Sequence, residues 1–114
     1  MINGDVLGLV LARSGSKGIK NKNIQLFLGE PLLVWPIKCL KNTQEISKVI
    51  LSTDSNEYRE IGIEAGAEAP FLRPKELSGD KATSFSVIEH AIEFLKKEEN
   101  HTFEYVVLLE PTSP

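Results

Sequence analysis

The stretch that decides the fold is Val6–Leu11, which reads Val-Leu-Gly-Leu-Val-Leu and leads directly into a polar segment at residues 12–23. A short apolar run without alternation is typical of a central strand that is covered on both faces. Residues 48–51 (Lys-Val-Ile-Leu) and 105–109 (Tyr-Val-Val-Leu-Leu) have the same character. The sequence therefore predicts three buried strands.

Helical periodicity separates these strands. Residues 33–40 predict a first helix, in which Pro36 is tolerable only in the first turn. A stripe of Tyr58, Ile61 and Ala65 predicts a second helix. The third helix is predicted from four apolar residues at spacings of three and four, namely Phe85, Ile88, Ile92 and Leu95.

The ends of the second helix also carry signals. Asp54 is suited to cap its N-terminus, with Glu57 three residues on, as in a variant of the capping box. Contact with a metal or a ribose is the alternative role for Asp54. Gly66 suits the C-terminal end of the same helix.

Strands that alternate with helices predict an α/β fold with a mostly parallel sheet and right-handed crossovers. Residues 68–72 are a weaker strand candidate, because Pro70 cannot donate to a ladder and indicates an edge position. In such sheets ligands bind beyond the carboxyl ends of the strands. Polar residues follow three strand ends, at 12–23, 52–55 and 110–114.

The composition is that of one ordinary globular domain, with 114 residues, 41% hydrophobic, 25% charged and a formal net charge of −3. No bulk positive field favours nucleic acid or an anionic membrane, so we expect neither as a partner. Cys39 is the only cysteine, which excludes a disulfide within the chain and suits a reducing compartment. The sequence shows no signal peptide and no apolar run of membrane-spanning length, so we expect a soluble cytoplasmic protein.

The polar segment after the first strand, residues 12–23, reads Ala-Arg-Ser-Gly-Ser-Lys-Gly-Ile-Lys-Asn-Lys-Asn. Its two glycines allow positive φ, so that successive backbone N–H groups can form an anion-binding nest. Arg13 can hold phosphate oxygens as a fork, whereas Lys17 and Lys22 act as point charges. The spacing fits neither a Walker P-loop nor the Gly-x-Gly-x-x-Gly fingerprint. The segment therefore favours a polyphosphate ligand held in another way.

These residues resemble the signature loop of the acylneuraminate cytidylyltransferases, the CMP-N-acetylneuraminic acid synthetases. The resemblance begins with Leu-Ala-Arg-Ser-Gly-Ser-Lys-Gly at residues 11–18, followed by Lys22 and Asn23. Four further segments resemble the family in the same order, namely Ser-Thr-Asp at 52–54, Arg-Pro-x-x-Leu at 73–77, Ser-Gly-Asp-Lys-Ala-Thr-Ser at 78–84 and Leu-Leu-Glu-Pro-Thr-Ser-Pro at 108–114. The resemblance covers essentially the whole chain, but only about the first half of a typical member.

The resemblance implies a three-layer, Rossmann-like nucleotidyltransferase fold related to glycosyltransferase A, here truncated. Residues 1–114 would be the N-terminal nucleotide-binding part of the domain, with the remainder absent and this part inactive alone. It implies transfer of CMP from CTP to an acidic nine-carbon sugar of the sialic acid type, with release of pyrophosphate. Family members need Mg²⁺ and are usually homodimers. Their magnesium-binding aspartates correspond to positions beyond residue 114, so we expect no metal ligand in this chain.

The resemblance also implies roles for single residues. Arg13 would contact the triphosphate and stabilise the charge on the departing pyrophosphate, assisted by Lys22, which makes these two the expected catalytic residues. Arg73 would lie near the base, Ala82 would offer backbone contacts to cytosine, and Ser84 a hydroxyl. The full set of expected nucleotide-binding residues is Arg13, Ser14, Gly15, Lys17, Asn23, Arg73, Ala82 and Ser84.

One departure concerns the sugar. Glu110 stands where the family commonly has a glutamine that faces the sugar. A carboxylate disfavours a second anion nearby, but it accepts hydrogen bonds from sugar hydroxyl or N-acyl N–H groups. Pseudaminic and legionaminic acid, and with them a different nucleoside triphosphate, therefore stay open as alternatives.

Two other functions also stay open. One is a different sugar-phosphate nucleotidyltransferase, and the other is a nucleotide-binding or assembly module without catalysis. The remaining notable residues fit structural roles. We expect His90 to be structural, His101 to be a solvated loop residue, Cys39 to be a small core residue, and Trp35 and Phe27 to pack rather than stack on a base.

Overall fold

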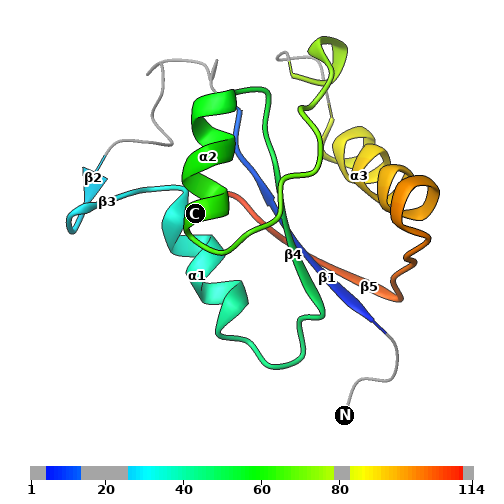
Figure 1. The fold of residues 1–114 in the computed structure, drawn as a ribbon, viewed down its shortest axis with the longest axis horizontal. Coiled ribbons are helices and arrows are strands. Elements are labelled where there is room, and N and C mark those ends of the chain that lie inside the picture. Colours follow the sequence, from blue (N-terminus) through cyan, green and yellow to red (C-terminus); the bar gives the residue numbers. More distant parts are fainter. Residues whose placement is uncertain (1–4, 14–25, 79–82, 112–114) are drawn as a thin grey trace.

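The protein's three-dimensional structure, a computed structural model, describes residues 5–13, 26–78 and 83–111. Its centre is a sheet with the order β4-β1-β5, formed by β1 (Val6–Leu11), β4 (Lys48–Ser52) and β5 (Tyr105–Leu109). Both pairings are parallel, and Leu9 lies opposite Ile50 on one side and Leu108 on the other. The predicted parallel α/β sheet is confirmed (Figure 1).

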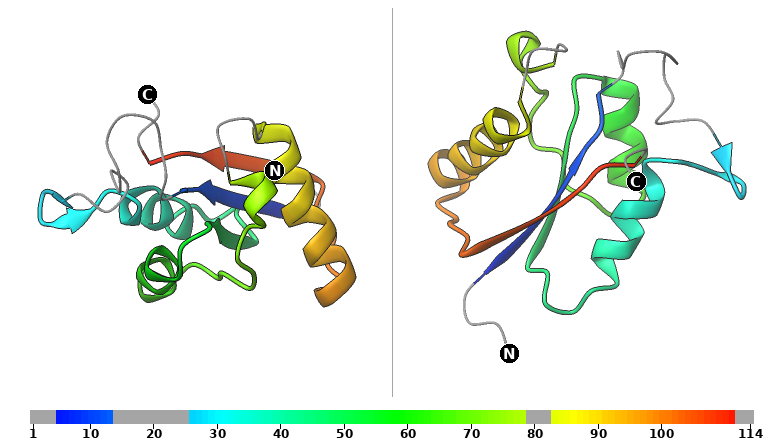
Figure 2. Two further views of the ribbon diagram at one scale, coloured as in Figure 1. Left: turned by 90° about the horizontal axis from the view of Figure 1, so that it is seen from above. Right: turned by 180° about the vertical axis from the view of Figure 1, so that it is seen from behind.

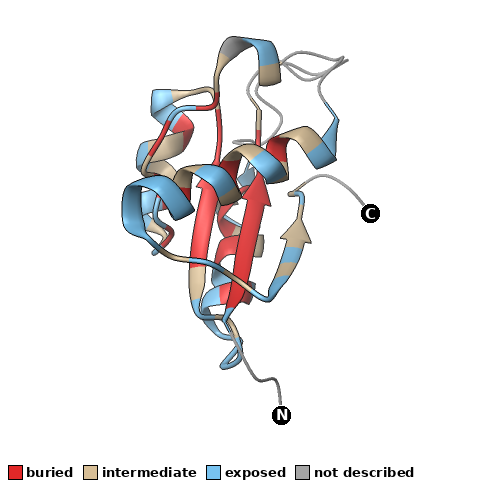
Figure 3. Cartoon of the chain, turned by 90° about the vertical axis from the view of Figure 1, so that its right-hand side faces the viewer, coloured by how far each residue is buried: buried red, intermediate tan, exposed pale blue. Residues whose placement is uncertain are grey.

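Helices cover both faces of this sheet. α1 (Val34–Lys41) and α2 (Asn56–Glu64) lie on one face and α3 (Ser84–Glu99) on the other (Figures 1 and 2). The alternation of β1 supplies both interfaces: Val10 packs in the cluster with α1 and α2, whereas Leu9 packs in the cluster with α3. β1 and β4 consequently form the buried middle layer (Figure 3). β5 is only partly buried, with Tyr105 and Val107 exposed, so the prediction of a third buried strand is wrong. The expected three-layer arrangement is confirmed.

The first helix matches its prediction, but one residue on it does not. Pro36 lies in the first turn of α1, where its missing N–H costs nothing. The buried side of the helix is formed by Val34, Ile37 and Leu40. Cys39 lies outside that stripe and is exposed, so the prediction of a core cysteine is wrong.

The N-terminus of α2 differs from the prediction by one residue. Ser55, not Asp54, is the N-cap: its backbone is extended, and its hydroxyl accepts a hydrogen bond from the Tyr58 N–H at 3.2 Å. Serine and aspartate are comparable caps, so the position of the first helical turn decides between them. Gly66 follows the helix with a φ of 109°, as its predicted terminal role requires.

The buried face of α3 also differs from the prediction. Phe85 lies in the first turn and is 73% exposed. Val87, Ala91 and Leu95 form the buried stripe instead, with Ile88 and Ile92 partly buried beside it. Thr83 caps the helix by accepting a hydrogen bond from the Ser86 N–H at 3.1 Å.

Two short features lie beside this frame. β2 (Leu26–Phe27) and β3 (Glu30–Pro31) form a small antiparallel hairpin that the sequence did not predict. The Trp35 ring meets Phe27 edge-on, and its Nε1–H donates to the Phe27 carbonyl at 3.1 Å, so these two aromatic residues pack on each other. The weak strand predicted at residues 68–72 is reduced to a single bridge between Ile50 and Glu68.

His101 is more engaged than a solvated loop residue. Its Nε2 lies 2.7 Å from Asp5 Oδ2, and its ring stacks on Phe103 with the ring centres 4.2 Å apart. The prediction for His101 is therefore wrong: the residue ties the start of β1 to the segment between α3 and β5.

Candidate functional site

The polar residues that follow the strands meet at one edge of the sheet. Because β1, β4 and β5 are parallel, their carboxyl ends lie together, and Arg13, Asp54 and Glu110 follow within two residues. The Ala12 N–H donates to the Ser52 carbonyl at 3.1 Å, which extends the pairing of β1 with β4 up to the residue before Arg13. Arg13 is half-buried, and Glu110 is exposed.

Arg73 reaches this edge from the segment after α2 and is only 6% exposed. Its backbone N–H donates to the Thr53 carbonyl at 2.8 Å. In the guanidinium, Nε donates to Ser52 Oγ at 3.1 Å and Nη2 to the Ser52 carbonyl at 2.8 Å. Nη1 lies 3.4 Å from the Leu77 carbonyl, in the short 3₁₀ turn η2 (Lys75–Leu77). Arg73 thus joins the end of β4 to the turn that follows it.

The charges at this edge act on one another. Burial is the main cause that lowers the pKa of Arg73, and the nearby cation of Arg13 lowers it further. The carboxylates of Asp54 and Glu110 act in the opposite direction and raise it. Arginine stays protonated despite such a shift, so the edge holds a permanent buried cation. The structure therefore brings together three of the predicted site residues, Arg13, Arg73 and Glu110.

The other predicted site residues are placed less closely or lie outside the described residues. Ser84 is the first residue of α3 and is exposed, one position after the Thr83 cap. Among the described residues, Ser84 makes no hydrogen bond to either arginine. The predicted residues outside the described ranges are Ser14, Gly15, Lys17, Lys22, Asn23 and Ala82.

Sequence reasoning gave no role to Ser52 and Thr53, which are buried polar residues at the end of β4. Their oxygens accept all the hydrogen bonds from Arg73 except the one to Leu77. A signal was present, because polar residues at the carboxyl end of an apolar strand need buried partners. It did not reveal which side chain that partner would be.

A half-buried histidine lies within electrostatic range of Arg73. His90 on α3 meets Phe71 edge-on, with ring centres 4.8 Å apart, and its Nδ1 is buried with no hydrogen-bond partner among the described residues. Burial lowers the pKa of His90, the cation of Arg73 lowers it further, and Glu76 opposes the shift. The expected structural role is consistent with this packing, and the imidazole is neutral at pH 7.

The edge of the sheet does not have the ligands of a metal site within the described residues. They contain no group of three or more His, Cys, Asp or Glu side chains arranged to hold an ion. Asp54 and Glu110 stand at the edge of the sheet, but they share it with two guanidinium groups. Two carboxylates beside two cations are a poor set for Mg²⁺, and we derive no step through a metal from them.

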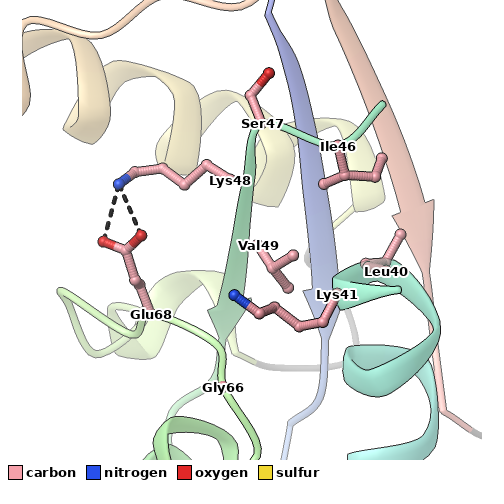
Figure 4. A pocket seen from close by; sticks show the side chains of 8 residues that line it. All are labelled: Leu40, Lys41, Ile46, Ser47, Lys48, Val49, Gly66 and Glu68. Atoms are coloured by element: carbon pink, nitrogen blue, oxygen red, sulfur yellow. Dashed lines mark hydrogen bonds and ion pairs between the residues drawn. The ribbon is translucent and has the colours of Figure 1, made fainter. Parts of the chain in front are cut away.

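A polar pocket lies at the opposite end of β4 (Figure 4). There Lys48 pairs with Glu68 at 2.9 Å and with Glu99 at 3.3 Å. Burial alone would lower the pKa of Lys48, but the hydrogen bonds and charges of the two glutamates outweigh burial and raise it. The two ion pairs of Lys48 thus join β4 to Glu68, which follows α2, and to Glu99 at the end of α3.

The arrangement of layers, with helices on both faces of a parallel sheet, defines a three-layer α/β fold. The solved structure of a CMP:2-keto-3-deoxy-manno-octonic acid synthetase complexed with CTP superposes with a TM-score of 0.72 over 94% of this chain and 40% of that chain, at 17% identity. Such a likeness shows the fold, which is the nucleotidyltransferase-like α/β fold expected from the sequence.

The family model described as cytidylyltransferase matches residues 7–113, and the chain belongs to this family. It is 40% identical over 109 residues to an N-acylneuraminate cytidylyltransferase of Escherichia coli O18:K1:H7, covering 96% of this chain and 25% of the relative. It is 42% identical over 108 residues to a pseudaminic acid cytidylyltransferase of Campylobacter jejuni, covering 95% of this chain and 46% of the relative. The chain therefore spans between a quarter and a half of the length of these relatives.

No helix among the described residues has the length and apolar character needed to cross a bilayer.

Proposed function

We propose that this chain is the nucleotide-binding part of an enzyme that transfers CMP from CTP to an acidic nine-carbon sugar and releases pyrophosphate. The observation that carries the proposal is the family match over residues 7–113. Relatives named for N-acylneuraminate and for pseudaminic acid support the class of acceptor. We further propose a cytoplasmic homodimer that uses Mg²⁺, with metal ligands outside the described residues.

The reaction is a displacement at the α-phosphorus of CTP. The anomeric oxygen of the sugar forms a bond to that phosphorus, and the bond to the bridging oxygen of the β-phosphate breaks. Pyrophosphate leaves with the electron pair. Negative charge therefore accumulates on the leaving side, where positioning and charge neutralisation supply most of the catalysis.

Arg13 is suited to that leaving side. It follows the central strand directly, and the hydrogen bond between Ala12 and Ser52 fixes the backbone just before it. A guanidinium held by a rigid strand needs little reorganisation when charge develops on the phosphates. In the proposal Lys22 assists Arg13. The nucleotide is also held by Ser14, Gly15, Lys17 and Asn23.

Recognition of the base and of the sugar is assigned to the rest of the edge. Arg73, Ala82 and Ser84 hold the nucleoside, and Glu110 faces the sugar. As an exposed carboxylate, Glu110 is able to accept hydrogen bonds from a polyhydroxylated ligand. Because it replaces the glutamine common in the family, pseudaminic and legionaminic acid are the alternatives to sialic acid.

A pyrophosphate-release assay on the full-length protein tests the proposal. CTP, UTP, GTP and ATP are each combined with a panel of nine-carbon acidic sugars in the presence of Mg²⁺. We expect release only with CTP and with one or a few of the sugars. Release with another triphosphate or a neutral sugar phosphate would instead support a different nucleotidyltransferase, and triphosphate binding without turnover would support a non-catalytic module.

A further inference from the structure

Ser52, to which the sequence analysis assigned no role, lies beside both arginines of the site. Ser52 ends β4 and is fully buried, with 0% of its surface exposed. Its hydroxyl therefore cannot reach a ligand bound beyond the sheet. Both of its oxygens nevertheless accept hydrogen bonds from Arg73, and its carbonyl also accepts one from the N–H of Ala12, the residue before Arg13.

The two oxygens of Ser52 hold Arg73 from one side. Nε of the guanidinium donates to the hydroxyl at 3.1 Å, and Nη2 donates to the carbonyl at 2.8 Å. These two N–H groups form one fork of the guanidinium, so the pair of bonds fixes both its place and its plane. A lysine at the same position would offer a single rotating ammonium and could not reproduce this geometry.

The same carbonyl also holds the strand that carries Arg13. The Ala12 N–H donates to the Ser52 carbonyl at 3.1 Å, next to Arg13 in the chain. Ser52 is thus the common partner of the buried Arg73 and of the backbone before Arg13. Arg13 and Glu110 both lie close enough to Arg73 to shift its pKa, Arg13 downward and Glu110 upward.

We propose that Ser52 is a positioning residue for nucleotide binding, which holds the Arg73 guanidinium at the edge of the sheet through its hydroxyl. This inference rests on the proposed function. Removal of the hydroxyl leaves the charge of Arg73 and its bonds to the Ser52 and Leu77 carbonyls in place. It removes the partner of Nε, so that the plane of the guanidinium is fixed less closely. The consequence is weaker binding of CTP, with little change in the chemical step, because the contacts of Arg73 are expected in the ground state as much as in the transition state.

The test compares two serines at the two ends of β4 in the full-length protein. Ser47→Ala is the matched control. The Ser47 hydroxyl also accepts one partly buried hydrogen bond, from the Val6 N–H at 3.0 Å, but Ser47 lies at the amino end of β4, away from the site. We expect Ser52→Ala to raise KM and Kd for CTP by about tenfold, as loss of one charge-assisted bond implies, while kcat stays within about twofold. We expect Ser47→Ala to leave KM unchanged. An unchanged KM in Ser52→Ala, or an equal rise in both variants, would overturn the inference.

A double-mutant cycle separates positioning from general damage. In an Arg73→Lys background the fork is already lost, so adding Ser52→Ala should change KM for CTP by less than about twofold. Effects that multiply fully would contradict the inference. Should Ser52→Ala melt below the assay temperature, Ser52→Cys retains the size with a weak acceptor, and the same rise in KM is expected.

The outcome also distinguishes this inference from the proposed function. If the wild-type protein neither binds CTP nor releases pyrophosphate from it, the proposed function fails and the inference falls with it. If the wild-type protein turns over CTP and Ser52→Ala is identical to it, the function stands and only the role of Ser52 is refuted.

Discussion

Arg13 and Arg73 have the same side chain but meet different surroundings at one edge of the sheet. Arg73 is almost fully buried, and three of its nitrogen atoms donate to protein oxygens. Arg13 is half-buried and begins the segment that leaves β1. A guanidinium that keeps access to solvent is suited to bind a mobile anion. One with three of its five N–H groups held by protein oxygens is suited to present the remaining two in a fixed direction.

Replacement of Arg13 tests its proposed catalytic role. We expect Arg13→Ala in the full-length protein to lower kcat by at least about a hundredfold, the usual cost of losing one preorganised donor to developing charge. The melting temperature should stay close to that of the wild type, because Arg13 lies outside the core clusters. Pyrophosphate release and thermal unfolding measure the two quantities.

Lys97→Ala is a suitable control for Arg13→Ala, since it removes one cation from the exposed end of α3. We expect it to leave kcat near the wild-type value. Near-normal turnover in Arg13→Ala, or an equal loss in both variants, would show that Arg13 does not stabilise the leaving group.

His90 makes the stability depend on pH. Because burial and Arg73 lower its pKa below the ordinary 6.5, the unfolded chain binds more protons than the folded one between the two values. The contribution of neutral His90 to stability is therefore complete above pH 6.5 and is lost as the pH falls toward the folded pKa. We expect the free energy of unfolding to drop between pH 7.5 and pH 5.5 by more in the wild type than in His90→Gln.

Urea unfolding at the two pH values measures this difference. The glutamine variant keeps a polar side chain of similar length without a titrating group, so the part of the pH dependence that belongs to His90 should disappear. Equal slopes in the two proteins would mean that the buried imidazole is protonated in the folded state as readily as in the unfolded one.

At the scale of elements, the fit of α2 against β4 depends on a glycine. Gly62 is buried in the helix, and a Cβ at this position would overlap Leu51 Cδ2, a fully buried side chain. Alanine is favoured over glycine in a helix by about 1 kcal/mol. We expect the overlap to outweigh this gain, so that Gly62→Ala lowers the free energy of unfolding by about 1–3 kcal/mol.

Urea unfolding of Gly62→Ala, next to Glu64→Ala on the exposed side of the same helix, checks this expectation. The control should stay within about 0.5 kcal/mol of the wild type, as surface substitutions usually do. A more stable Gly62→Ala protein would show that Leu51 moves aside without cost and that helix propensity decides.

The elements themselves were largely predictable from the sequence. Apolar runs located β1 and β5 at their observed bounds and β4 to within one residue. For β1 and β4 the physical reason is that strands buried on both faces allow few polar residues, whereas β5 is apolar but only partly buried. Helix faces were less predictable. Phe85 fits the periodicity of α3 but lies in its first turn beyond the sheet, whereas the small Ala91 fills the contact. Periodicity indicates a face, but it does not indicate which residues the neighbouring layer reaches.

The site was predictable in kind but not in its supporting contacts. The loop after β1 identified Arg13, and the resemblance identified Arg73, because both depend on local sequence. That Ser52 holds Arg73 follows from contacts between residues 21 positions apart. Such contacts exist only once β4 and the segment after α2 have come together, and no local pattern encodes them.

For the whole molecule, the net charge of −3 means that affinity for a triphosphate depends on where the cations are placed. Parallel strand order brings the ends of β1, β4 and β5 to one edge, so that Arg13 and Arg73 lie together in an otherwise acidic protein. Ligand binding to this edge should then stabilise the entire fold, because the ligand binds the folded chain and not the unfolded one.

CTP is accordingly expected to raise the melting temperature of the full-length protein. At a concentration of about a hundred times Kd, the gain in unfolding free energy is about 2.7 kcal/mol, which corresponds to about 10 °C for a domain of this size. GTP at the same concentration should shift the melting temperature much less, since its base does not fit a cytosine site. Arg13→Ala should lose most of the CTP shift. Equal shifts with CTP and GTP would mean that the full-length protein binds the phosphates without reading the base, and would contradict the proposed specificity for CTP.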